Sequence, residues 1–308
     1  MKKQRVLNVI NEMEKAGLSQ IIVSSTASIY YLTGKWISAG ERMIALYLNK
    51  NGEHKFIVNK LFPIEEDLGV EIVWYTDSED SIKILSNIVN KNEALGVDKF
   101  WPAQYIIRLM ELNAVKGFVN SSGIIDELRM VKDEEEKDLM RNASNINDMA
   151  MEKLQNLLTQ DLTEKEMAQR LASIYDELGA DGFSFPPIIA YGANGADPHA
   201  HCGSAKLKEG DCVILGIGCI KDNYCSDMTR TVFYKSAPEK AKEVFNIVLE
   251  ANKRAIAMVK PGVRFCDIDN AAREYITEKG YGKYFTHRTG HSIGIETHDM
   301  GDVSSINT

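Results

Sequence analysis

The sequence of 308 residues lacks any apolar run long enough to span a bilayer and any secretory type of apolar segment near its start. It also lacks clusters of Lys and Arg. Its 36 basic residues are outnumbered by 44 acidic ones, which gives a formal net charge of -8. Binding to a phosphate backbone needs clustered positive charge, which argues against nucleic acid as a main partner. We therefore expect a cytoplasmic protein with neither a membrane nor a nucleic-acid partner.

Cysteine is scarce and shows no pairing pattern. The five cysteines are Cys202, Cys212, Cys219, Cys225 and Cys266. An odd number without a CxxC motif is typical of a reducing compartment. We interpret them as buried thiols that pack as small apolar groups, with metal ligation as the less favoured alternative.

The chain is long for one domain, and its 44% of apolar residues suffices for a substantial core. We predict two domains, residues 1–130 and 131–308, with a hinge near residues 120–133. Short apolar runs alternate with amphipathic stretches in the first of them, which predicts a layered α/β domain. The expected strands cover residues 21–23, 43–48, 55–58, 71–75 and 95–97, and the expected helices include residues 81–89 and 103–112. Asn51-Gly52 predicts a type I′ turn that joins the strands 43–48 and 55–58 in a hairpin.

Two capping boxes begin the predicted C-terminal domain. Asp133 with Glu136, and Thr163 with Glu166, have the spacing of a helix N-cap and its third helical residue. We therefore predict one helix to about residue 158 and a second to about residue 178.

The C-terminal half contains a spaced near-repeat. One copy runs from Thr163 to His199 and the other from Val263 to His298, and each contains a helix followed by a Gly-rich turn. Val263 lies 100 residues after Thr163, and His298 lies 99 residues after His199. This spacing indicates a duplicated unit of two helices and a hairpin. Two strands, about 212–219 and 224–234, follow the first copy, and their counterparts would lie near residues 312–334. The second copy is therefore expected to be incomplete at Thr308.

Histidines and one aspartate are the candidates for chemistry. Five of the six histidines lie in the second half: His199, His201, His287, His291 and His298. A lone histidine is more often structural, but several in matched places of two half-repeats favour a site. Asp227 lies among strand-forming residues, where Asp is depleted, and either a metal ion or a hydrogen bond to Thr229 or Arg230 would explain it.

Five segments carry a resemblance to a known family. Residues 210–231 resemble the segment in which pita-bread metallopeptidases place two Asp ligands on adjacent strands, and His287 to Gly294 resembles their HRTGHGIG segment. Asn194 to His199 resembles their N-x-x-x-P-H segment, Lys260 to Val263 resembles their KPG turn, and Tyr31 to Gly34 resembles the YLTG of the prolidase and creatinase N-terminal domain. The similarity covers essentially the whole chain, which also resembles aminopeptidase P.

The resemblance implies a creatinase/prolidase-type N-terminal α/β domain and a C-terminal pita-bread α+β domain that is incomplete at its end. It implies an Xaa-Pro dipeptidase or aminopeptidase that hydrolyses peptide bonds before proline, with small proline-containing peptides as substrates, and a homodimer. The implied catalytic machinery is a hydroxide held between two divalent metal ions. Mn, Co or Zn suits a set of oxygen ligands with one imidazole.

Carried over by position, Asp227 matches the aspartate that bridges the two metals, and His291 matches the single histidine ligand. His199 and His298 match the two histidines that contact substrate. The other Asp ligand would stand eleven residues before Asp227, where this chain has Gly216.

Two Glu ligands of the family lie on the strands expected beyond Thr308, and Asp299 replaces a Glu that often follows the second histidine. Two of five ligands therefore remain, and we predict that the chain as written does not hydrolyse Xaa-Pro dipeptides at a family-like rate. The alternatives are a catalytically inactive pita-bread protein that binds peptides or a partner chain and, as a third possibility, a metal-independent amidinohydrolase like creatinase.

Overall fold

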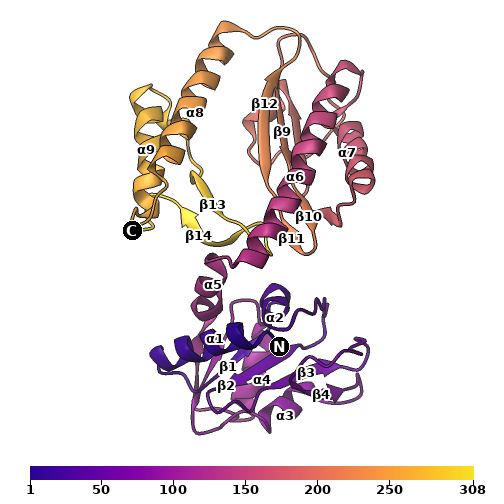
Figure 1. The fold of residues 1–308 in the computed structure, drawn as a ribbon, viewed down its shortest axis with the longest axis vertical. Coiled ribbons are helices and arrows are strands. Elements are labelled where there is room, and N and C mark those ends of the chain that lie inside the picture. The colour runs from indigo at the N-terminus through magenta and orange to yellow at the C-terminus, as the bar shows by residue number, and fades with distance from the viewer. The chain divides into compact units, whose positions relative to one another are not determined.

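The computed structural model describes residues 1–308 and divides them into two compact units, Met1–Val131 and Lys132–Thr308. Both units combine helices with strands (Figure 1), which confirms the predicted α/β class. None of the helices combines the length and the apolar character needed to cross a membrane.

The first unit is built on a six-stranded sheet in the order β4-β3-β2-β1-β5-β6. Its strands are β1 (Gln20–Val23), β2 (Ala45–Asn49), β3 (Lys55–Asn59), β4 (Glu71–Tyr75), β5 (Ala94–Val97) and β6 (Gly117–Asn120). Its helices are α1 (Lys3–Lys15), α2 (Thr26–Thr33), α3 (Ser81–Ser86), α4 (Ala103–Glu111) and α5 (Ser122–Met130). Strand β1 pairs antiparallel with β2 and parallel with β5, and all four of its residues are buried, as expected for a central strand.

Helices cover both faces of this sheet. Helices α1, α2 and α5 contact one another, and α3 contacts α4 (Figure 1). The buried side chains of Leu85 from α3 and Leu109 from α4 pack on Ile22 and Ile57 of the sheet. The layered architecture predicted for residues 1–130 is therefore confirmed.

Two local predictions for this unit were wrong. Asn51-Gly52 does not form a type I′ turn, because a five-residue loop joins β2 and β3 and only Gly52, with φ +85°, has positive φ there. The predicted helix 81–89 is shorter, since α3 ends at Ser86. The YLTG segment ends helix α2, where Gly34 adopts the left-handed conformation with φ +77°.

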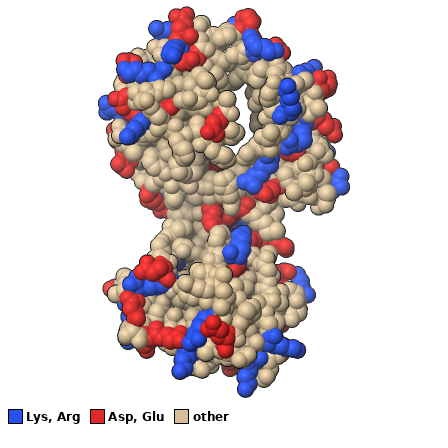
Figure 2. Space-filling view, turned by 180° about the vertical axis from the view of Figure 1, so that it is seen from behind, with Lys and Arg blue, Asp and Glu red and all other residues tan.

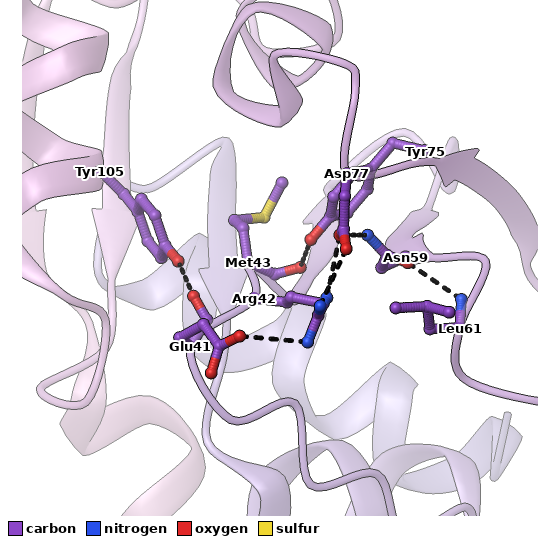
Figure 3. A network of polar contacts seen from close by, with 8 residues as sticks. All are labelled: Glu41, Arg42, Met43, Asn59, Leu61, Tyr75, Asp77 and Tyr105. Carbon is purple, nitrogen blue, oxygen red and sulfur yellow. Dashed lines mark hydrogen bonds and ion pairs between the residues drawn. The ribbon is translucent and has the colours of Figure 1, made fainter.

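Figure 3 shows a polar network that anchors the segment before β2 to the ends of β3 and β4. The guanidinium of Arg42 donates from Nε and Nη2 to the two carboxylate oxygens of Asp77, at 2.9 and 2.8 Å. Asn59 donates from Nδ2 to the same carboxylate at 2.7 Å, and the Tyr75 hydroxyl donates to the carbonyl of Met43 at 2.7 Å. Side-chain bonds therefore hold this loop in place where the backbone ladder has ended.

The second unit begins with α6 (Glu134–Asn156) and α7 (Glu164–Leu178), and both predicted capping boxes are present. Its first-half strands are β7 (Gly182–Phe183), β8 (Ile188–Tyr191), β9 (Cys212–Ile217), β10 (Cys219–Lys221), β11 (Tyr224–Cys225) and β12 (Met228–Phe233). They form two three-stranded sheets, β12-β9-β8 and β11-β10-β7. Leu154, Leu171, Ile189 and Leu215 form part of the core between these helices and strands.

The two long strands predicted around residues 212–219 and 224–234 are each broken in two. A Cβ atom on Gly218 would lie 2.3 Å from the backbone oxygen of Ser226, so the chains approach there too closely for any side chain. Asp222 and Asn223 both have positive φ and form the two-residue turn between β10 and β11. Asp227 falls in the break between β11 and β12.

The second half of this unit has its own core. It contains α8 (Glu239–Met258), α9 (Phe265–Glu278), β13 (Gly290–Ser292) and β14 (Asp299–Val303). Ala251 and Ala255 of α8 pack against Ile268 and Ala272 of α9, and β13 pairs with β14. The repeat inferred from the sequence therefore corresponds to two helix pairs, each with its own cluster of buried side chains.

Acidic and basic side chains are interspersed on the face of the molecule that Figure 2 shows. This arrangement agrees with the absence of Lys and Arg clusters from the sequence.

All five cysteines are free, and three of them, Cys219, Cys225 and Cys266, are buried.

Candidate active site

The segment that joins β13 to β14 is attached to the first half of the second unit. The backbone N–H of Cys225 donates to the carbonyl of Gly294 at 2.8 Å, and the hydroxyl of Thr297 donates to the carbonyl of Ser184 at 2.7 Å. The Cys225 thiol donates to the carbonyl of Ile295 at 3.4 Å. These bonds fix the segment beside β11, next to which Asp227 lies.

Three of the four predicted site residues come together here. The Nε2 atom of His291 lies 3.6 Å from Oδ2 of Asp227, and the ring centroids of His291 and His298 are 4.3 Å apart. Asp227 and His298 come from opposite halves of the repeat, and the hydrogen bonds of Gly294, Ile295 and Thr297 connect the two halves next to them. The contact with His291 replaces the hydrogen bond to Thr229 or Arg230 that was considered for Asp227.

Burial shifts the protonation of two members of this group in opposite directions. Partial burial raises the pKa of the Asp227 carboxyl, while the adjacent His291 and His298 act to lower it. Burial lowers the pKa of His298, as does the positive charge of His291 and of Arg288. Both shifts favour neutral forms, as expected when ionisable groups lose contact with water.

The fourth predicted residue, His199, has a different neighbour. Its side chain is exposed, and its ring centroid lies 6.3 Å from that of His287. Its backbone N–H donates to Oδ1 of Asp197 at 2.9 Å. His201 is exposed as well. The structure thus pairs His199 with His287, four residues before His291.

Gly216 stands where a second carboxylate would be needed. It is paired with Thr229 across β9 and β12, and facing residues in an antiparallel ladder project on the same side of the sheet. Thr229 follows Asp227 by two residues, so position 216 faces the side on which Asp227 is expected. Gly216 does not have positive φ, so its backbone conformation suits other residues, but a Cβ atom there would lie 3.3 Å from Cβ of Ile188, which would have to shift by a few tenths of an ångström.

The residues present do not fit a two-metal centre. Asp227 is the single carboxylate of the group, while Asp299 is paired with Lys132 at 3.5 Å and Asp302 with Arg288 at 2.6 Å. Nowhere does the chain arrange three or more His, Cys, Asp or Glu side chains so that they could hold a metal ion. Two divalent cations require several anionic oxygens, and this site supplies one carboxylate.

Two buried carboxylates near the site were not foreseen from the sequence. Asp269 accepts from Arg273 Nε at 2.6 Å and from the Thr289 hydroxyl at 2.7 Å, and Arg273 in turn donates to the carbonyls of Phe285 and His287. Glu164 binds the segment that carries His199. The i,i+4 spacing of Asp269 and Arg273 was a usable signal for an ion pair. An acid at the first position of a helix is too common to single out Glu164.

The fold and the site define a two-unit α/β protein whose second unit is an internally repeated metallopeptidase-type domain. Residues 138–308 match the Metallopeptidase family M24, and residues 5–131 match the Creatinase/Prolidase N-terminal domain. The chain therefore belongs to the M24 metallopeptidase family, the pita-bread group that the motifs indicated. Membership of this family implies a divalent metal cofactor.

Three relatives illustrate the similarity. An uncharacterized peptidase from Staphylococcus aureus strain MRSA252 is 33% identical over 313 residues, which cover 99% of this chain and 87% of the relative. A prolidase from Thermococcus sibiricus is 32% identical with a TM-score of 0.92, and the match covers 100% of this chain and 86% of that one. An Xaa-Pro dipeptidase from Bacillus anthracis is 28% identical with a TM-score of 0.88, covering 99% and 85%.

Proposed function

We propose that this chain is an Xaa-Pro peptidase-type protein that binds short proline-containing peptides at the site formed by Asp227, His291 and His298. The observation that carries the proposal is the convergence of these three side chains from both halves of the repeat. The similarity to a prolidase and to an Xaa-Pro dipeptidase over nearly the whole chain supports the class of ligand.

The proposed roles follow from the position and protonation of each side chain. Burial lowers the pKa of His298 and so favours its neutral ring, which offers one ring nitrogen as donor and the other as acceptor to a peptide group. Asp227 with His291 provides a half-buried carboxylate beside an imidazole, which suits a hydrogen-bond donor of the ligand such as an amino group. His199 and His287 supply a second pair of imidazoles for the same ligand.

The bound peptide is either hydrolysed, as the first candidate function, or held without hydrolysis, which is the second candidate and the one we favour. Gly216 favours it, because the position beside Asp227 lacks the carboxylate that a two-metal centre needs. The two candidates share the ligand and differ in turnover, so binding and hydrolysis have to be measured separately.

Binding of Ala-Pro to the purified chain, measured by calorimetry, tests the shared part of the proposal. We expect His298→Ala to weaken binding by roughly tenfold, the worth of one or two hydrogen bonds. His201→Ala is the matched control, because His201 is exposed and lies outside the three-residue group. Absence of binding to the unaltered chain, or equal losses in both variants, would refute the proposed site.

A further inference from the structure

Glu164 is the first residue of α7, and its side chain is completely buried at 0% exposure. Its Oε1 atom accepts from the backbone N–H of Tyr191 at 2.8 Å and from Nδ2 of Asn194 at 2.9 Å. Its Oε2 atom accepts from the backbone N–H of Gly203 at 2.9 Å. All three donors belong to uncharged residues.

The donors lie at the two ends of one loop. Tyr191 ends β8, Gly203 lies twelve residues further on, and His199 lies between them. The backbone N–H of Lys165 also donates to the carbonyl of Gly203 at 3.0 Å, so the start of α7 holds the far end of the loop twice. Asn194, the first residue of the N-x-x-x-P-H segment, directs its side chain to Glu164.

A buried carboxylate is costly unless hydrogen bonds replace its hydration. Here the bonds come mainly from the loop, and the N-terminal end of α7 adds a favourable field. The carboxylate is therefore satisfied only when residues 191–203 are folded around it, which couples the burial of the charge to the shape of the loop.

We propose that Glu164 is a positioning residue that fixes the loop 191–203 and thereby holds His199 where it contacts a bound peptide. This inference rests on the proposed function, because His199 is assigned there to the peptide. Glu164 itself has no contact with the ligand in this assignment.

The test compares Glu164→Gln with Glu166→Gln. A Gln at position 164 retains one acceptor oxygen but presents an N–H₂ group where the second oxygen accepts from Gly203. Glu166 lies in the same helical turn and accepts from the backbone and hydroxyl of Thr163, so its variant weakens the helix cap and leaves the loop bonds intact. A general loss of stability would affect both variants, and loss of positioning would affect only the first.

Two readouts are needed for each variant: amide hydrogen exchange of residues 192–203 and the Kd for Ala-Pro. We expect Glu164→Gln to raise the exchange rates and the Kd by about tenfold or more, because hydrogen bonds to a charged group are among the stronger ones. Glu166→Gln should change neither. Unchanged loop exchange in folded Glu164→Gln, or an equal rise in Glu166→Gln, overturns the inference.

If Glu164→Gln does not fold, Asn194→Ala tests the same inference. It removes one of the three bonds from an exposed residue, so we expect a smaller rise of loop exchange and of Kd in the same direction. No change in either quantity overturns the inference. If the unaltered chain binds no Ala-Pro, the proposed function fails, and the exchange comparison still decides whether Glu164 fixes the loop.

Discussion

Gly216 and Thr229 face each other across β9 and β12, and a Cβ atom built on Gly216 would lie 3.5 Å from the hydroxyl oxygen of Thr229. Its other close neighbours are Cβ of Ile188 at 3.3 Å and the backbone oxygen of Ile188 at 3.6 Å, so a side chain at position 216 requires Ile188 to shift by a few tenths of an ångström. The missing carboxylate of this site is therefore a matter of one residue type at a position whose backbone permits another.

Gly216→Asp is expected to tighten the binding of Mn²⁺ by at least about tenfold, because the number of anionic ligands sets the affinity for hard cations. Calorimetric titration measures the effect. Gly216→Asn is the control, since it fills the same space without the charge. Equal affinities in the Asp and Asn variants would show that position 216 does not face the metal-binding side of Asp227.

Residues 1–308 are expected to show no turnover of Ala-Pro above a buffer control, even with Mn, Co or Zn added. The reason is the single carboxylate of the site, which would leave a metal ion weakly held and largely hydrated. An assay of released proline measures this. Robust turnover that His291→Ala abolishes would contradict the assignment of the ligands.

The Asp269 carboxyl gives an acid-sensitive contribution to the stability of the second unit. Burial acts to raise its pKa, but hydrogen bonds from Arg273 and Thr289 prevail, and the pKa is lowered in the folded state. A lowered pKa stabilises the fold above the unfolded value of about 3.9, and this contribution disappears as the pH falls through the folded pKa. We expect Asp269→Asn to cost roughly 1–3 kcal/mol at neutral pH and progressively less below about pH 4.

Urea unfolding at several pH values checks this expectation. The three tryptophans, Trp36, Trp74 and Trp101, all lie in the first unit, so their fluorescence marks its transition. Far-ultraviolet circular dichroism reports the helices of both units, and the transition absent from the fluorescence belongs to the second. If the free energies of unfolding of the unaltered chain and of Asp269→Asn differ by the same amount at every pH, the assigned role of Asp269 is refuted.

Arg42 is expected to hold the pKa of Asp77 below its ordinary value in the network of Figure 3. Its hydrogen bonds are the main cause of the lowered pKa of Asp77, with a smaller contribution from Asn59 and opposition from partial burial. Arg42→Met should therefore raise the Asp77 pKa towards its ordinary value, and Asn59→Ala should raise it less. Carboxyl carbon NMR during a pH titration measures both, and an unchanged pKa in Arg42→Met would show that the ion pair does not form in solution.

Local features of the fold were predictable where a few adjacent residues determine them. The capping boxes at Asp133 and Thr163 occur as expected, because a cap depends on residues three positions apart. The type I′ turn predicted at Asn51-Gly52 was wrong because five residues, and not two, separate the end of β2 from the start of β3. The break at Gly218 was missed because it depends on contact with Ser184 and Ser226, which are distant along the chain or across a hairpin.

The sequence by itself determined the family, the two-part organisation of the motifs and the residue types available for chemistry, including the glycine at position 216. Only the tertiary structure decided that Asp227, His291 and His298 meet while His199 lies beside His287. It also decided that Glu164 is a buried loop anchor as well as a helix-starting acid. The physical reason is that contacts between the two half-repeats come from packing and hydrogen bonds such as Cys225 to Gly294, whose partners no local pattern specifies.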